Sequence, residues 1–174
     1  MRHSLRTLLD LLPSFLVTMP RKIDTLLKSK DDNSLCDALF AALVAHYGGD
    51  LDISKCKQSD QVVLLAWNAT GIIDNGGFQY LLESKFKGDP HFTRTAAAYK
   101  AIKADKCAAA FAEVLALFSE SKPPADIETR LKLYQSVSTA KRKAFDNKFF
   151  DQSKAIAGIL GRYIRDNRDA FTHL

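Results

Sequence analysis

The chain has 174 residues, of which 47% are hydrophobic and 26% charged, and its formal net charge is +5. This composition excludes a disordered chain, and the length suits one domain. The three cysteines, Cys36, Cys56 and Cys107, lie far apart and show no C-x-x-C spacing. They favour buried thiols in a reducing cytoplasm over a disulfide framework or a zinc site, and no sequence motif indicates a cofactor.

Residues 1–20 form the first element in chain order. Arg2 and Arg6 precede a leucine-rich run that Asp10 and Pro13 interrupt. The run is too short to cross a bilayer, and no clear signal-peptide cleavage site follows it. We therefore expect an amphipathic extension, or a stretch upstream of a start at Met19, and no membrane attachment. The rest of the chain, 21–174, is predicted to form a single helical domain.

Beyond that extension, apolar residues recur at the three- and four-residue spacing of amphipathic helices. Asn33 or Ser34 caps the first predicted helix, Asp105 caps another, and Phe145 anchors a turn before the last one. The predicted helices cover 33–46, 59–73, 78–85, 93–103, 105–118, 123–137 and 156–164. Because alternating strand patterns are absent, the sequence predicts an all-α fold with about seven to nine helices in one bundle-like domain.

The stretch "DNGGFQY" separates two of these helices. Glycine adopts left-handed backbone conformations without steric cost and asparagine tolerates them, so Asn75, Gly76 and Gly77 predict a tight helix-to-helix corner. A ligand site is the alternative. The backbone N–H groups of Gly76, Gly77 and Phe78 would face an anion at a helix start, and Asn75 and Gln79 could add hydrogen bonds.

The longer segment "AWNATGIIDNGGFQYLLES", which contains Trp67 and the corner, resembles the signature of a bacterial domain family of unknown function whose named member is a DNA-mimic protein. The resemblance covers roughly residues 58–171. It implies an all-helical domain and a role in protein interaction. Mimicry of DNA requires a strongly acidic surface, whereas this chain has 20 acidic and 25 basic residues.

The excess of basic residues lies in the last third of the chain, where residues 121–174 carry eleven basic and six acidic side chains. Lys141, Arg142 and Lys143 form the sharpest cluster. Such a cluster is typical of a nucleic-acid contact, and equally of a solvated helix face. No metal-ligand or nucleophile motif occurs, so an enzyme is not expected.

The sequence therefore predicts a non-enzymatic, cytoplasmic module that binds a protein partner, with a homodimer as an open alternative. Its expected binding residues are Asn75, Gly76, Gly77, Gln79, Lys141, Arg142 and Lys143. The competing hypothesis is a nucleic-acid-binding protein that uses the basic last third of the chain.

Overall fold

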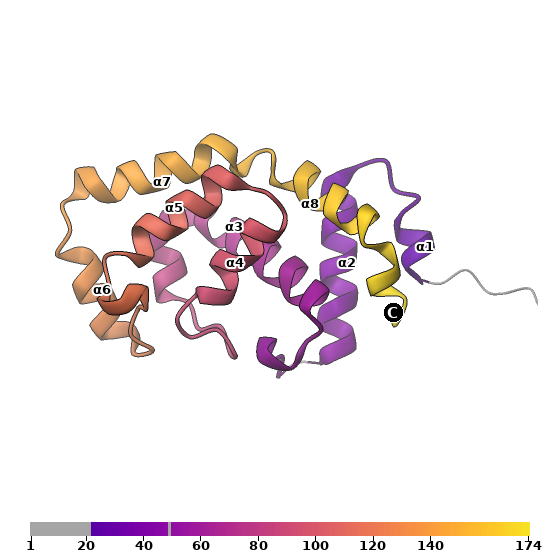
Figure 1. Cartoon of the computed structure of the whole chain (residues 1–174), viewed down its shortest axis with the longest axis horizontal. Helices are drawn as coiled ribbons and strands as arrows, with labels where there is room; N and C mark the ends of the chain where they lie inside the picture. The colour runs from indigo at the N-terminus through magenta and orange to yellow at the C-terminus, as the bar shows by residue number, and fades with distance from the viewer. Residues whose placement is uncertain (1–21, 49) are drawn as a thin grey trace, which may run out of the picture.

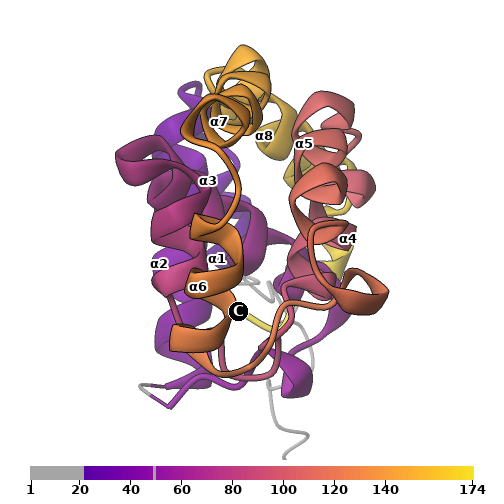
Figure 2. The ribbon, with the colours of Figure 1, turned by 90° about the vertical axis from the view of Figure 1, so that its left-hand side faces the viewer.

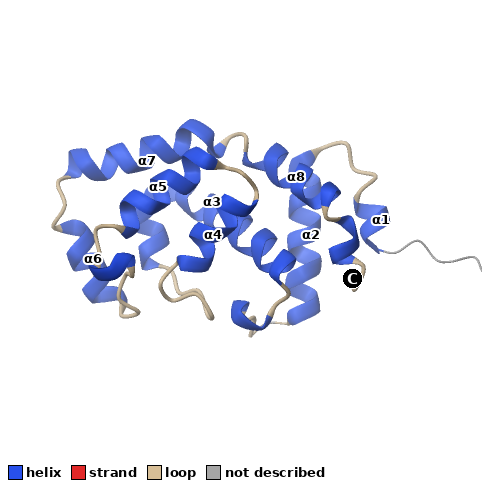
Figure 3. Ribbon diagram, viewed as in Figure 1, coloured by secondary structure: helices blue, strands red, loops and turns tan. Residues whose placement is uncertain are grey.

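The computed structural model describes residues 22–48 and 50–174, and within these ranges the chain forms eight α-helices and no strand (Figure 3). The predicted all-α fold is therefore confirmed, and the helix number falls within the expected range. The predicted amphipathic extension over residues 1–20 lies outside the described residues.

The helices form two walls joined by a third layer. In the end-on view of Figure 2, α2 and α3 lie on one side, α4 and α5 on the other, and α7 lies above both, with α6 nearest the viewer. Figure 1 shows α7 and α8 following one another along the same edge of the molecule. The bounds are α1 Lys22–Leu26, α2 Asp32–Tyr47, α3 Gln58–Glu83, α4 Thr93–Ala101, α5 Asp105–Leu115, α6 Ile127–Gln135, α7 Thr139–Ser153 and α8 Ile156–Asp166.

The central element is α3, which packs against α2, α4, α6, α7 and α8. Its second half brings Phe78 into a cluster of buried rings with Tyr99, Phe111 and Phe149. The ring centroid of Phe78 lies 5.2 Å from that of Phe111 and 5.7 Å from that of Phe149, both with edge-to-face geometry. Aromatic pairs favour this arrangement, so the cluster ties α3 to α4, α5 and α7 at one point.

The predicted helices over 59–73 and 78–85 are the two halves of α3, with the corner between them. The start of α2 differs from the prediction, because Asp31 is its N-cap rather than Asn33 or Ser34. The Asp31 carboxylate accepts the backbone N–H of Ser34 at 2.8 Å. Gly48 ends α2 with a φ of 81°, a conformation that glycine provides at helix ends.

The start of α5 also corrects the prediction. Asp105 is not its cap, because the N-cap position belongs to Ala104, whose side chain cannot accept a hydrogen bond. The free N–H groups of Lys106 and Cys107 instead donate to Oε1 of Gln152, at 2.9 and 3.1 Å. A side chain from α7 therefore caps α5, and no local pattern in the sequence indicates this.

Two further boundaries differ from the prediction. The helix expected from residue 123 begins at Ile127, after the N-cap Asp126, whose carboxylate accepts the N–H of Thr129 at 2.8 Å. Phe145 lies inside α7 and is buried there, whereas it was expected in a turn; the turn into α8 comes at 154–155. The prediction missed α7 as a separate helix because its hydrophobic periodicity is weak.

All three cysteines are free and buried. Burial raises the pKa of the Cys36 and Cys107 thiols to about 12, so both stay protonated and unreactive at neutral pH. Within the described residues, no helix combines the length and the apolar composition that a bilayer crossing requires.

Candidate functional site

The predicted corner is present in α3. Gly76 has φ −157° and ψ 19°, and Gly77 has φ 68° and ψ −169°, so the helical path breaks at these two residues. Of the three residues Asn75, Gly76 and Gly77, only Gly77 has a positive φ, which corrects the expectation that Asn75 and Gly76 share it. Asn75 stays in the helix, and its Nδ2 donates to the carbonyl oxygen of Gly71 at 2.7 Å.

Gly77 is buried against α7. A Cβ atom at this position would lie 2.6 Å from both carboxylate oxygens of Asp146, closer than real contacts allow. The same carboxylate accepts the backbone N–H of Phe78 at 2.9 Å. The anion that faces the helix start after the corner is therefore a side chain of the protein itself.

The environment of Asp146 opposes its ionisation on balance. Burial raises the pKa of its carboxyl group above the ordinary value, while the Phe78 N–H and the positive charge of Arg142 partly counteract that shift. Asp146 thus joins the corner to α7 through one backbone hydrogen bond and a partly desolvated carboxylate.

Gly76 has a different neighbour. A Cβ atom there would lie 2.1 Å from Cγ of Tyr80, because the tyrosine ring lies directly over the Gly76 backbone. Although one side of the ring is covered in this way, Tyr80 is 51% exposed, the largest exposed fraction recorded for a bulky hydrophobic side chain in the described part of the chain. The missing side chain at Gly76 therefore allows an aromatic ring to lie on the surface in a defined position.

The fold brings part of the predicted basic cluster to this corner. Nη1 of Arg142 donates to Oε1 of Gln79 at 3.3 Å, and the Arg142 guanidinium lies 5.7 Å from the ring centroid of Tyr134. Two sets of residues that the sequence indicated separately thus meet through Gln79 and Arg142. We call the surface made by Asn75, Gln79, Tyr80 and Arg142 the corner patch.

The other two members of the basic cluster lie on the exposed side of α7. Nζ of Lys141 lies 5.9 Å from the ring centroid of Phe145. Lys143 is exposed, and no ion pair involves it among the residues that the structure describes. These lysines add positive charge near the corner patch, but among the described residues no hydrogen bond or ion pair joins them to Asn75, Gly76 or Gly77.

Several other basic residues of the last third have partners within the chain. Lys148 pairs with Glu113, Arg165 with Asp32 at 2.7 Å, and Arg168 with Asp24 at 3.3 Å. These pairs join α7 to α5, α8 to α2, and the C-terminal turn to α1. Part of the basic excess is therefore used in contacts between helices and is less available for phosphate groups.

Arg130 is a further basic residue whose side chain is buried in the fold, and no sequence pattern indicated its role. It is 1% exposed; its Nε donates to the Leu82 carbonyl at 2.5 Å and its Nη2 to the Ser84 carbonyl. Its guanidinium also lies 5.1 Å from the ring centroid of Phe92. Burial lowers the pKa of Arg130. This buried cation satisfies the last carbonyl groups of α3, where positive charge suits the helix dipole.

A buried polar cluster near the C-terminus was also missed. Asp60 is fully buried, accepts the hydroxyl of Tyr47 at 2.6 Å, and has its Oδ2 2.9 Å from Nε2 of His173. The His173 ring packs edge-on against the His46 ring, 5.0 Å away between centroids. This cluster joins the end of the chain to α2 and α3. No group of three His, Cys, Asp or Glu side chains in the described residues is arranged to hold a metal ion.

A comparison with family models matches residues 54–167 to the family described as DMP19-like protein. The match covers 114 of 174 residues, which is more than half of the chain. The chain belongs to the DMP19-like family. The comparisons with curated proteins and with solved structures found no match.

Membership in the DMP19-like family confirms the resemblance that the sequence indicated around the corner. The matched range runs from the turn before α3 to the end of α8, so every residue of the corner patch lies inside it. Helix α2, which forms the wall beside the first half of α3, lies outside it.

Proposed function

We propose that this DMP19-like protein is a non-enzymatic module that binds another protein through the corner patch. The observation that carries the proposal is the position of Tyr80, a half-exposed aromatic ring held over the backbone of Gly76. Binding hot spots are rich in tyrosine and arginine, and a ring that is already ordered loses little conformational entropy on association.

Polar groups next to Tyr80 support the same role. Gln79 donates through Nε2 to Glu83 at 3.0 Å and accepts from Arg142, so it links a carboxylate and a guanidinium across the patch. Arg142 is partly exposed, although its Nε is buried and has no hydrogen-bond partner within the described residues. The positive charge of the guanidinium beside Tyr80 favours a partner surface that carries acidic residues.

We do not extend the proposal to DNA mimicry. A protein that replaces DNA needs a dense array of negative charge to match a basic groove, and this chain carries five more basic than acidic residues. The corner patch itself contains Arg142, and Lys141 and Lys143 flank it on α7. Both features favour a partner of opposite charge from the one that a DNA mimic would bind.

Site-specific photo-crosslinking tests the proposal. A photoreactive phenylalanine analogue replaces Tyr80 in one variant and Lys100 in a matched control, because both residues are exposed and Lys100 lies on α4. In extract of the native cells, we expect a discrete crosslinked protein from position 80 and none from position 100. The crosslink should weaken when Arg142→Ala is added.

Equal crosslinking from the two positions, or none from position 80, would contradict the proposal. Crosslinking to nucleic acid instead of protein would support the competing hypothesis of a nucleic-acid-binding protein. In that case, binding should also fall steeply between about 50 and 200 mM salt, because counterions are released from phosphates.

A further inference from the structure

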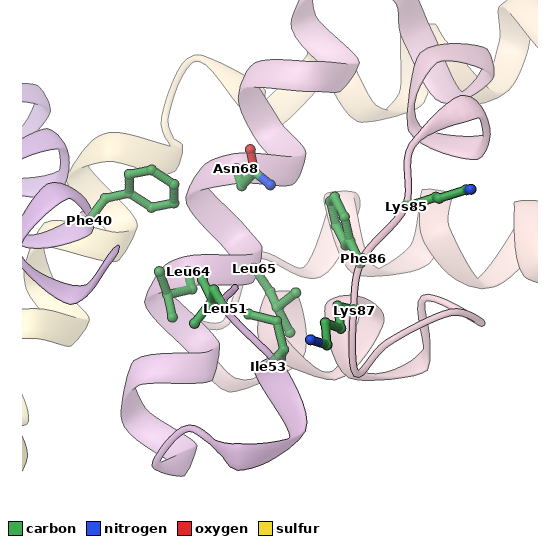
Figure 4. A pocket seen from close by; sticks show the side chains of 9 residues that line it. All are labelled: Phe40, Leu51, Ile53, Leu64, Leu65, Asn68, Lys85, Phe86 and Lys87. Atoms are coloured by element: carbon green, nitrogen blue, oxygen red, sulfur yellow. The ribbon is translucent and has the colours of Figure 1, made fainter. Parts of the chain in front are cut away.

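A groove runs along α3 on the side that faces α2, separate from the Tyr80 ring. Its closed end is a cavity of about 120 Å³ with apolar walls formed by Leu51, Leu64, Leu65 and Phe86, and with Phe40 at its edge (Figure 4). A cavity of about 150 Å³ holds a benzene molecule, so this space matches a single aliphatic or aromatic side chain.

A second hollow continues the groove toward the corner. It measures about 300 Å³ and shares Phe40 and Asn68 with the closed cavity. Trp67 and Gly71 line it farther along α3, and Asn75 lies at its far end. The groove therefore extends from Leu64 to Asn75, and the eleven helical steps between these two residues rise about 16 Å, the length of a helix of about three turns.

Gly71 is the unexplained residue of this groove. It lies in the interior of α3, where glycine destabilises a helix relative to alanine. A Cβ atom at Gly71 would meet no heavy atom within 4 Å, so no contact among the described residues requires a glycine there. The missing side chain of Gly71 leaves open space on the surface of α3, and this space borders the second hollow.

The two ends of the groove differ in charge. Lys85 and Lys87 flank Phe86 at the cavity end; Lys87 pairs with Asp50 at 2.5 Å, and the Lys85 side chain points away from the cavity (Figure 4). At the other end, Asp37 is exposed and accepts the indole N–H of Trp67 at 2.9 Å. Neither α2 nor α3 contains a lysine or arginine, so no basic side chain of these two helices offsets Asp37.

We propose that this groove binds an amphipathic segment of a partner protein. One bulky apolar side chain of the segment fills the cavity, and a basic residue of the segment lies near Asp37. The apolar anchor pocket at one end and the acidic side chain at the other fix the direction of the segment, and the groove has the length of a helix-in-groove site. This inference rests on the proposed role of the chain as a protein-binding module.

Peptide display tests the groove directly. A library of random peptides of about twelve residues is selected on the full chain, and the enriched peptides are measured by fluorescence anisotropy against variants. Asn68→Trp places a large ring over the junction of the two hollows, and Lys100→Trp is the matched control on α4. Both positions are exposed, so each variant should keep the wild-type thermal melting curve.

We expect enriched peptides to contain an apolar anchor with a basic residue on one side of it. Asn68→Trp should weaken their binding by at least about tenfold and Lys100→Trp should leave it unchanged. Asp37→Asn, which removes the negative charge, should weaken binding severalfold. Selection of no peptide, or equal binding by the Asn68→Trp variant, would overturn the proposal.

Two controls separate this inference from the corner patch and from self-association. Tyr80→Ala should leave peptide binding unchanged. If position 80 gives no crosslink while the selected peptides still bind, the corner patch is rejected as a binding site and the groove is retained. Sedimentation equilibrium of the wild type should show no dimer that Asn68→Trp dissociates. Such a dimer would place a second copy in the groove and overturn the proposal.

Discussion

Glycine serves two different purposes within α3, and the contrast lies in what a side chain would meet. At the corner, Gly77 has a positive φ and faces the carboxylate of Asp146, and Gly76 lies under the ring of Tyr80. In the middle of the helix, Gly71 has nothing within 4 Å of the position of a Cβ atom. The fold accounts for the first pair and leaves Gly71 without an internal role.

A glycine that the fold requires is no evidence of a binding surface, whereas a glycine that the fold does not require can be. At the corner, the glycines are needed for the backbone path and for the approach of α7, so they would be present whether or not a partner binds. Evidence for function there comes from the exposed ring of Tyr80. In the groove, Gly71 itself is the evidence, because it weakens the helix and no neighbouring atom among the described residues requires a glycine there.

Arg130 holds the end of the second half of α3, beyond the corner. Arg130→Leu should lower the free energy of unfolding by about 3 kcal/mol or more, because the buried carbonyls of Leu82 and Ser84 lose their charged donor. Urea denaturation measures the change. Lys132→Ala, at an exposed position of the same helix, should change it by less than about 0.5 kcal/mol. Similar effects from both variants would contradict the role given to Arg130.

The strongest test of the corner is Gly77→Ala. A positive φ costs an L-residue about 1–3 kcal/mol, and the new methyl group must also displace the Asp146 carboxylate. We expect a loss of about 2 kcal/mol or more in the free energy of unfolding, measured by urea denaturation. A change of less than about 0.5 kcal/mol would show that the corner does not depend on Gly77.

The same substitution at Gly71 should have the opposite sign. Gly71→Ala fills open space inside a helix, so it should raise the free energy of unfolding by up to about 1 kcal/mol. For a chain of this size, the melting temperature should rise by about 2–4 °C in a thermal scan. A lower melting temperature would mean that the fold does require a glycine there, and the contrast with Gly77 would disappear.

The smallest predicted effect concerns the pH dependence of Asp146→Asn. Burial raises the native pKa of Asp146, so the wild type gains stability when this group is protonated and loses that gain as the pH rises through the native pKa. The asparagine variant has no such group. The free energy of unfolding of the variant relative to that of the wild type, measured by urea denaturation at about pH 4 and pH 7, should therefore be higher at pH 7. A relative value that is lower at pH 7 would contradict burial as the dominant cause of the raised pKa.

The sequence predicted those features that depend on local chemistry. The all-α class, the end of α2 at Gly48 and the corner at Gly76–Gly77 follow from helical periodicity and from the conformational freedom of glycine. The basic cluster was identified in advance, although its contact with the corner was not.

The remaining features depend on contacts between distant parts of the chain. Asp146 is 68 residues from Phe78, Arg142 is 63 residues from Gln79, and Gln152 caps a helix start 46 residues before it. No spacing within a single element encodes these meetings. The same holds for the groove, whose walls come from α2, α3 and the loops that contain Leu51 and Phe86, and whose α2 side lies outside the range matched to the DMP19-like family.

The central claim is that this chain binds a protein through the surface at its α3 corner, and an affinity measurement tests it most directly. The partner identified by crosslinking from position 80 would be titrated by calorimetry against the wild type and against the double variant Tyr80→Ala/Arg142→Ala. Two hot-spot residues should together contribute more than about 2.7 kcal/mol, so the account predicts a dissociation constant at least about 100-fold higher for the variant. A dissociation constant within about threefold of the wild-type value, for a variant with an unchanged melting curve, would contradict it.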